Sequence, residues 1–168
     1  MSEYTHIIHS FAPVYDKNSR VLILGSLPSV KSREEGFYYG HTRNRFWAVT
    51  AAIAGKPVPV TNDEKKAFLL SSNIAVWDVV AECDIIGSSD SSIKNVKAAD
   101  ISEILALCPD ISVFANGGTA SALYDRYILP NTSRPAVKLP STSPANAAWN
   151  TERLTAEWKK ALSPILFR

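Results

Sequence analysis

Cysteine is scarce in this chain of 168 residues, which contains only Cys83 and Cys108. The two lie far apart and lack metal-ligand spacing, which argues against a zinc site or an iron–sulfur cluster. Such sparse cysteine suits a reducing compartment, so we expect a cytoplasmic protein whose thiols are small buried hydrophobes. The sequence predicts neither a metal nor an organic cofactor.

Long apolar runs and strong charge are also missing. No run approaches the roughly 20 residues that span a bilayer, so we expect no membrane association. The opening Met-Ser-Glu-Tyr-Thr-His has neither a basic nor an apolar stretch, and predicts no signal peptide. A net charge of +2 means that any nucleic-acid surface is a local patch. There is no internal repeat, and we expect one globular domain, residues 1–168, that is a monomer.

Four short apolar runs are present, and their lengths suit buried strands. They are Val21–Leu24, Ile74–Val80, Ile111–Ala115 and Ala136–Leu139. Amphipathic stretches separate them, and begin at Phe46, Asp63, Asp100, Thr119 and Asn150 or Thr151. Strands that alternate with helices indicate an α/β fold: a three-layer sandwich with a four-stranded, mainly parallel sheet between helices.

Local signals set some helix ends. Gly55 and Pro57 are expected to end the helix that begins near Phe46. Asp100 is expected to be the N-cap of a capping box in which Glu103 reaches back to the helix start.

In parallel sheets ligands bind beyond the carboxyl ends of the strands, so the segments that follow the four runs are informative. All four are small, turn-forming or polar. They are Gly25–Ser29, Ala81–Asp84 with Gly87–Asp90, Asn116–Gly118 and Pro140–Asn146. We therefore expect one edge of the sheet to hold the functional site.

The most unusual segment, Tyr38–Trp47, follows the first of these exits. It gathers four aromatics, a histidine, two arginines and an asparagine in ten residues. A core helix would space its rings by threes and fours, and a surface loop rarely carries so many large rings. Flat rings, guanidinium groups and an amide are suited to stacking on a base and holding its phosphates, so the segment favours nucleic-acid binding.

Each exit segment also has an ordinary structural interpretation. Gly25–Ser29 is either a tight strand exit or a loop whose amides face a ligand, and it is neither a Walker loop nor a dinucleotide fingerprint. Asn116 either stabilises a turn or presents an amide that reads a base edge. Pro140–Asn146 is either a stiff loop or a rigid wedge whose hydroxyls and amides grip phosphates.

Single polar residues have similarly open roles. His41 is a candidate acid or phosphate contact, although we favour a role in holding its loop by hydrogen bonds. N-capping is the default role of Asn44. Asp78 and Asp90 are expected to stabilise turns or strand ends rather than catalyse. Basic side chains near the exits would form the local patch: Lys31, Arg33, Arg43, Arg45, Lys94, Lys97 and Lys138.

Three segments in order, Gly25–Ser29, Tyr38–Trp47 and Leu139–Asn146, resemble the uracil-DNA glycosylase superfamily. Within it the chain is most similar to the hypoxanthine-DNA glycosylase branch, with the mismatch-specific uracil/thymine glycosylases next. The resemblance covers about Phe11 to Trp158, and its specific element is His-x-x-Asn-Arg-Phe-Trp. It implies a four-stranded α/β fold and a repair enzyme that flips a damaged base out of double-stranded DNA and hydrolyses its N-glycosidic bond with water.

The resemblance also implies roles for individual residues. Gly25 and Ser26 would lie near the sugar and the bound base. Tyr39 would stack on the extruded base, Asn44 would act at the scissile bond, and Asn116 would read the base edge. The remaining residues would contact DNA: His41, Arg43, Arg45, Pro140, Ser141, Thr142, Ser143 and Pro144.

The chain departs from the family pattern at two positions. Many members place Asp, Glu or Asn where Leu27 stands, and several have His or Asn where Leu139 starts the last motif. Without a carboxylate in the first motif there is no strong general base, so Asn44 is the leading catalytic residue. We expect a slow enzyme that depends on a good leaving group, such as hypoxanthine, xanthine or uracil.

Other functions remain open. A uracil/thymine mismatch glycosylase and a non-catalytic lesion-binding domain of the same fold both fit the motifs. A different hydrolase would use Ser26 or Ser29 as a nucleophile, but it would need a histidine partner. Only His6, His9 and His41 are present.

Overall fold

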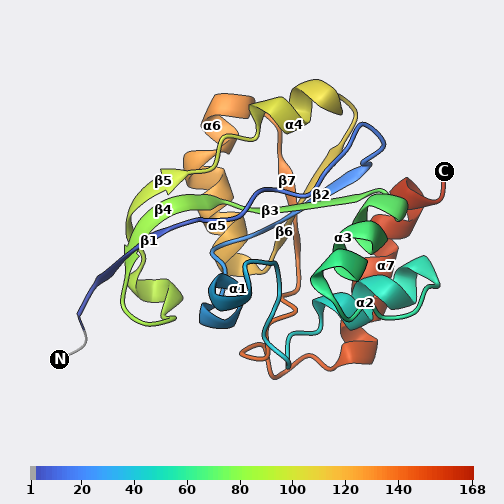
Figure 1. Ribbon diagram of the computed structural model, residues 1–168. Helices are drawn as coiled ribbons and strands as arrows, with labels where there is room; N and C mark the ends of the chain where they lie inside the picture. Colours follow the sequence, from blue (N-terminus) through green and yellow to red (C-terminus); the bar gives the residue numbers. More distant parts are fainter. Residues whose placement is uncertain (1–2) are drawn as a thin grey trace.

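The computed structural model describes residues 3–168, and a four-stranded sheet with every neighbouring pair parallel forms its centre (Figure 1). The strand order is β3-β2-β6-β7. The strands are β2 (Val21–Gly25), β3 (Ile74–Asp78), β6 (Ser112–Asn116) and β7 (Ala136–Leu139). The predicted α/β fold with a four-stranded parallel sheet is confirmed.

Helices cover both faces of this sheet. Figure 1 shows α2, α3 and α7 on one side, and α4, α5 and α6 on the other. Strand β2 is fully buried, and its alternate residues belong to two apolar cores: Val21 and Ile23 face one helical layer, Leu22 and Leu24 the other. The helices are α1 (Val30–Glu35), α2 (Phe46–Ala54), α3 (Asn62–Ser71), α4 (Ser102–Leu107), α5 (Gly118–Tyr127), α6 (Leu129–Thr132) and α7 (Thr151–Leu166).

A second, antiparallel sheet of order β1-β4-β5 was not expected from the sequence. Its strands are β1 (Thr5–Ile8), β4 (Val80–Ile85) and β5 (Lys94–Ala98), with the short helix η1 (Asp90–Ser92) between the last two. The single strand predicted over 74–80 is therefore wrong: β3 ends at Asp78, and β4 begins at Val80. The chain changes sheets where the backbone N–H groups of Val79 and Val80 donate to the carbonyls of Gly25 and Ser26, at 2.8 and 3.1 Å.

Most predicted helix ends agree with the structure. Gly55 caps α2 at φ +67°, and the Asn150 side chain accepts from the Arg153 N–H at the start of α7. The capping box at Asp100 is wrong. Helix α4 begins at Ser102, and Asp100 only accepts a local hydrogen bond from the Ser102 N–H at 3.0 Å.

The two cysteines are buried and free, as predicted from their scarcity. Across residues 3–168, no helix has the length and apolar character needed to cross a membrane. In the same residues, no group of three or more His, Cys, Asp or Glu side chains is placed to hold a metal ion.

Candidate active site

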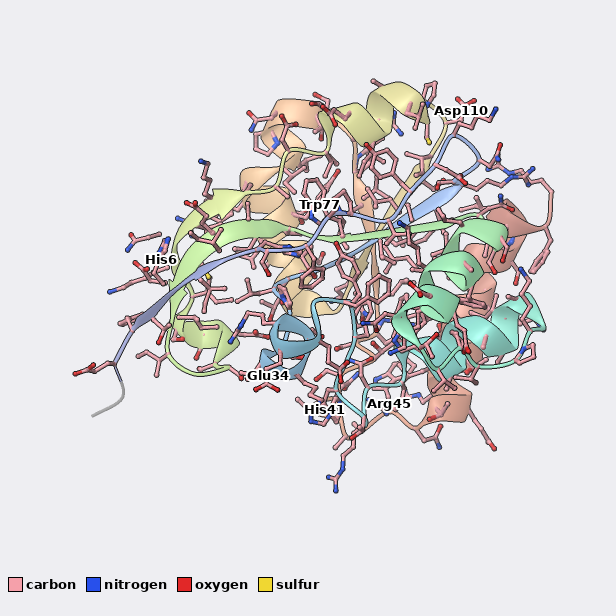
Figure 2. All side chains as sticks on the ribbon, viewed as in Figure 1. His6, Glu34, His41, Arg45, Trp77 and Asp110 are labelled. Atoms are coloured by element: carbon pink, nitrogen blue, oxygen red, sulfur yellow. The ribbon has the colours of Figure 1, made fainter. Side chains whose placement is uncertain are left out.

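A cavity of about 980 Å³ opens at the carboxyl ends of the parallel strands, within the size range of small-ligand pockets. The segments that follow β2, β6 and β7 line it, together with Gly87–Ser88 beyond β4 and part of the aromatic segment. They are Gly25–Ser29, Gly87–Ser88, Asn116–Thr119, Lys138–Asn146, and Tyr38, Tyr39, His41 and Asn44. Figure 2 shows His41 and Arg45 at this edge of the molecule. The predicted convergence on one edge is confirmed, except that 81–84 lie within β4.

The first motif is a tight exit from β2 that continues into α1. Ser29 is the N-cap of α1, and its Oγ accepts from the Ser32 N–H at 3.1 Å. A side chain at Gly25 would collide with its neighbours, because a Cβ there would lie 2.5 Å from Oδ1 of Asp78 and 3.3 Å from the hydroxyl of Tyr39. Gly25 thus lets a carboxylate and a phenol approach the end of β2.

Leu27 is half-buried against the core of the antiparallel sheet. Leu139 is buried in the core beneath α2 and α7. Both residues that replace polar side chains of the family pattern therefore act as packing residues here.

Three of the four rings in the aromatic segment belong to the core. Tyr38, Phe46 and Trp47 are buried, whereas Tyr39 is only partly buried and lines the cavity. One face of Tyr39 lies on Phe46, with ring centres 4.0 Å apart and planes 16° from parallel. Burial, and then the negative charge of Asp78, raises the pKa of Tyr39, which keeps it a neutral phenol. Of the two rings that line the cavity, Tyr38 is buried and Tyr39 is the more accessible, so the segment that we interpreted as a stacking surface offers mainly Tyr39 to a ligand.

The amide of Asn44 is oriented by the start of α2. Its Oδ1 accepts from the Phe46 N–H at 2.9 Å, at the first residue of the helix. The N-cap position itself is occupied by Arg45, one residue later than predicted. The contact with Phe46 identifies the oxygen, so the other atom of the amide is the NH₂ group. Within residues 3–168 this Nδ2 has no hydrogen-bond acceptor, and Asn44 lines the cavity. Asn44 therefore offers a fixed donor to whatever the cavity holds.

His41 stabilises its own loop, the role that we favoured. Its Nδ1 accepts from the Arg43 N–H at 3.1 Å, and its carbonyl accepts from the Asn44 N–H at 2.9 Å. An accepting Nδ1 places the proton of the neutral ring on Nε2, which remains exposed at the rim. The Arg43 side chain is exposed and makes no hydrogen bond or ion pair within residues 3–168. It stays a candidate phosphate contact.

Arg45 has a different position from the one its DNA-binding assignment requires. Its guanidinium donates to the carbonyls of Thr142, Ser143, Asn146 and Trp149, and its backbone N–H also donates to Thr142. Four of the five donors on this side chain are therefore engaged within the protein. Arg45 holds the last motif against the start of α2, and is a poor candidate for a phosphate contact.

Asn116 also links two motifs. Its Nδ2 donates to the hydroxyls of Thr142 and Tyr39, at 3.0 and 3.3 Å, and its Oδ1 accepts from the Thr142 N–H at 3.1 Å. These bonds use both ends of the amide, so the geometry favours a positioning role. Reading of a base edge by Asn116 stays a prediction.

The last motif is a stiff loop. Thr142 is fully buried, Asn146 donates to the Ser141 carbonyl, and Trp158 on α7 donates to the Pro140 carbonyl. Hydroxyls of the loop bind its own backbone, since Ser141 accepts from the Ser143 N–H at 3.1 Å. Pro144 and its neighbour Ala145 are exposed at the tip. This arrangement fits a rigid wedge, and contact of the loop with DNA stays a prediction.

The expected basic patch is smaller than predicted. Lys138 and Arg33 line the cavity. Lys94 and Lys97 instead lie on β5, opposite Asp84 and Glu82 in the antiparallel sheet. The sequence did not predict this sheet, and the two lysines were therefore assigned to the wrong surface.

A buried histidine–aspartate pair at the cavity was missed. Asp78 ends β3 and lines the cavity, and its Oδ2 accepts from Nε2 of His9 at 2.8 Å. Each of the two side chains is only 5% exposed. We expected Asp78 to stabilise a turn or strand end, and nothing near His9 indicated a site, because its partner lies 69 residues away.

The serine-nucleophile alternative loses its base. The three histidines bind Asp84, Asp78 and the Arg43 backbone, and none of them is hydrogen-bonded to a serine within residues 3–168. Ser29 is instead engaged with Ser32.

Known proteins resemble this chain over most of its length. The model of the "Uracil DNA glycosylase superfamily" matches residues 12–164. A hypoxanthine DNA glycosylase of Methanosarcina acetivorans is 32% identical over 154 residues, which cover 91% of this chain and 96% of the relative. A hypoxanthine DNA glycosylase of Methanosarcina barkeri is 33% identical over 68% of this chain and 73% of its own. The solution NMR structure of a candidate uracil DNA glycosylase from M. acetivorans superposes with a TM-score of 0.79 at 31% identity, covering 94% of this chain and 97% of its own.

Proposed function

This chain belongs to the uracil DNA glycosylase superfamily, and we propose that it removes deaminated bases, hypoxanthine foremost, from double-stranded DNA. Two relatives that bear the name hypoxanthine DNA glycosylase support this choice of base. The observation that carries the proposal is the cavity itself, which brings a tyrosine ring and a free amide donor together at one edge of the sheet.

The cavity provides what an extruded base needs. A flipped nucleotide leaves the stack at a cost of a few kcal/mol, least at a mispair or lesion. Stacking on the free side of Tyr39 would return about 1–3 kcal/mol. Because Phe46 and Trp47 hold Tyr39 from behind, the ring is already in place before the base arrives.

Asn44 acts on the departing base in this proposal. As the bond between C1′ and the base nitrogen breaks, its electron pair moves onto the base, which becomes anionic. The Nδ2 donor of Asn44 is already oriented by the Phe46 N–H, so it stabilises this charge with little reorganisation. A donor of this kind helps hypoxanthine, xanthine and uracil most, since these bases carry the negative charge better than adenine or guanine.

The outer surface contacts DNA through a rigid loop and a few polar side chains. Arg45 and Asn116 fix 140–146 against the body of the protein. The exposed tip at Pro144 enters the minor groove beside the flipped nucleotide, and Arg43 contacts a phosphate. We infer that one copy of the chain acts on one lesion.

The test is a panel of labelled duplexes that carry one deoxyinosine, deoxyxanthosine, deoxyuridine or G·T mispair. The protein is incubated with each duplex, and abasic sites are converted to breaks with alkali. We expect breaks at deoxyinosine first. Breaks only at uracil or at the mispair would mean that the protein is a DNA glycosylase with a different preferred base. Binding to the lesions without any break would show a binding domain instead.

A further inference from the structure

The cavity contains a carboxylate that the first motif lacks. Asp78 pairs in register with Gly25, the first residue of that motif, across the parallel strands β2 and β3. Its Oδ2 is bound by His9, whereas its Oδ1 has no hydrogen-bond partner within residues 3–168. Oδ1 is not among the shielded, unpartnered atoms of the structure, and Asp78 lines the cavity, so this oxygen faces the cavity. A glycine at position 25 makes that approach possible.

His9 holds the carboxylate in one orientation. Its ring lies 4.5 Å from Phe11 and 6.0 Å from Tyr38, centre to centre, so it has little room to rotate. Among residues 3–168, its buried Nδ1 has no hydrogen-bond partner. An unpaired lone pair costs less than a buried, unpaired N–H of a charged ring, so the geometry favours neutral His9 donating from Nε2. The negative charge of the pair then lies on Asp78.

We propose that Asp78 is the catalytic carboxylate of this enzyme, supplied by β3 in place of the absent first-motif side chain, and that His9 positions it. This inference rests on the proposed glycosylase function. It replaces the expectation that the site contains no strong base, which considered only the first motif.

The bond from C1′ to the base nitrogen breaks, and its electron pair leaves with the base, while the sugar becomes an oxocarbenium ion. The negative charge of Asp78 stabilises that cation. The Asp78 carboxylate then accepts a proton from a water molecule as the oxygen of that water bonds to C1′. Asp78 returns this proton to solvent, and the base anion takes a proton from solvent. The products are the free base and an abasic sugar.

The test compares single-turnover excision of hypoxanthine by wild-type protein and by Asp78→Asn, with protein in excess over a deoxyinosine duplex. Asn keeps the shape and can still accept from His9, but it carries no charge and is a poor proton acceptor. We expect the rate to fall about 10²-fold or more. The dissociation constant for a duplex with a 2′-fluorinated deoxyinosine, which resists cleavage, should change less than threefold.

The chain provides a matched control pair on its surface. His6 and Asp84 form the same kind of contact, at 2.8 Å, on β1 and β4. Figure 2 shows His6 at the left of the view, apart from His41 and Arg45 at the lower edge. Asp84→Asn should therefore leave both the rate and the affinity unchanged.

A second pair of variants guards against misfolding and tests the positioning role. Asp78→Ala should be as slow as Asp78→Asn and should recover at least tenfold when formate is added. His9→Phe should lower the rate about tenfold at unchanged affinity, and His9→Gln, which keeps an N–H donor, should recover part of that loss.

The outcomes separate the two claims. If the wild type excises hypoxanthine and folded Asp78→Asn does so at the same rate, the role of Asp78 is wrong while the glycosylase function stands. If Asp78→Asn does not fold, failure of formate to accelerate Asp78→Ala overturns the inference. If the wild type excises nothing from any duplex of the panel, the proposed function itself fails.

Discussion

At the scale of single residues, Asn44 shows how a structural and a chemical role can coexist. The oxygen of its amide accepts from the N–H of Phe46 at the start of α2. The nitrogen of the same amide has no acceptor within residues 3–168, and the residue lines the cavity. The two roles can be separated because Asp keeps the accepting oxygen and loses the donor.

We expect Asn44→Ala to lower the single-turnover excision rate about 10²-fold or more. Asn44→Asp should be at least as slow, although it keeps the acceptor for the Phe46 N–H, because it removes the donor and adds negative charge beside an anionic leaving base. Melting temperatures should show that Asn44→Asp is the more stable of the two. An Asn44→Asp protein with the wild-type rate would contradict the donor role.

Tyr39 provides the second prediction at this scale. Tyr39→Leu removes the stacking surface and should weaken binding of the 2′-fluorinated deoxyinosine duplex by about 5- to 150-fold, the equivalent of 1–3 kcal/mol. Tyr39→Phe keeps the ring and loses only the 3.3 Å contact from Asn116, so its affinity should stay within threefold of wild type. Equal losses in both variants would mean that the hydroxyl, and not the ring, binds the base.

At the scale of elements, the sequence predicts regular segments well and long-range partners poorly. The runs at 21–24 and 136–139 became β2 and β7 almost residue for residue. Strand β2 is fully buried and therefore continuous in apolar residues, whereas β7 is an edge strand whose middle residues are exposed. Strand β5 reads Lys-Asn-Val-Lys-Ala and is mostly exposed, so no apolar pattern revealed it or the antiparallel sheet.

In the candidate site, too, local features could be predicted from the sequence and long-range contacts could not. The location of the site at the carboxyl ends of the strands could be predicted from the alternation of strands and helices, and a contact of Asn44 with the start of α2 could be predicted from local spacing. The roles of Arg45 and His9 depend on partners 97 and 69 residues away, so no local pattern could reveal them.

Arg45 gives the prediction for the link between α2 and the last motif. Arg45→Met leaves several loop carbonyls without their charged donor, so we expect the free energy of unfolding to fall by at least about 2 kcal/mol. Arg43→Met removes an exposed arginine two residues away and should change it by less than about 0.5 kcal/mol. Urea unfolding of both proteins checks this, and equal stabilities would mean that the guanidinium does not hold the loop.

At the scale of the whole molecule, a net charge of +2 leaves little general attraction for DNA. Glu34 and Glu35 on α1 are exposed, and Lys31 forms an ion pair with Glu35 at 3.5 Å, so α1 adds little positive charge to this edge. Affinity must then depend on a few phosphate contacts and on the base in the cavity.

Arg43 is our candidate for one such contact. We expect Arg43→Met to weaken binding of damaged and undamaged duplexes by the same factor. A plot of log affinity against log salt concentration should become shallower by about 0.9, the value for one phosphate. An unchanged slope would exclude Arg43 as a phosphate contact.

The most direct measurement of the central claim is the identity of what the protein releases from a deoxyinosine duplex. Mass spectrometry of the small-molecule fraction, with abasic sites counted in the same sample, measures both products. We expect free hypoxanthine and abasic sites in equal amounts, with strand breaks only after alkali. Deoxyinosine left in the duplex, or strand breaks without free hypoxanthine, would contradict the account.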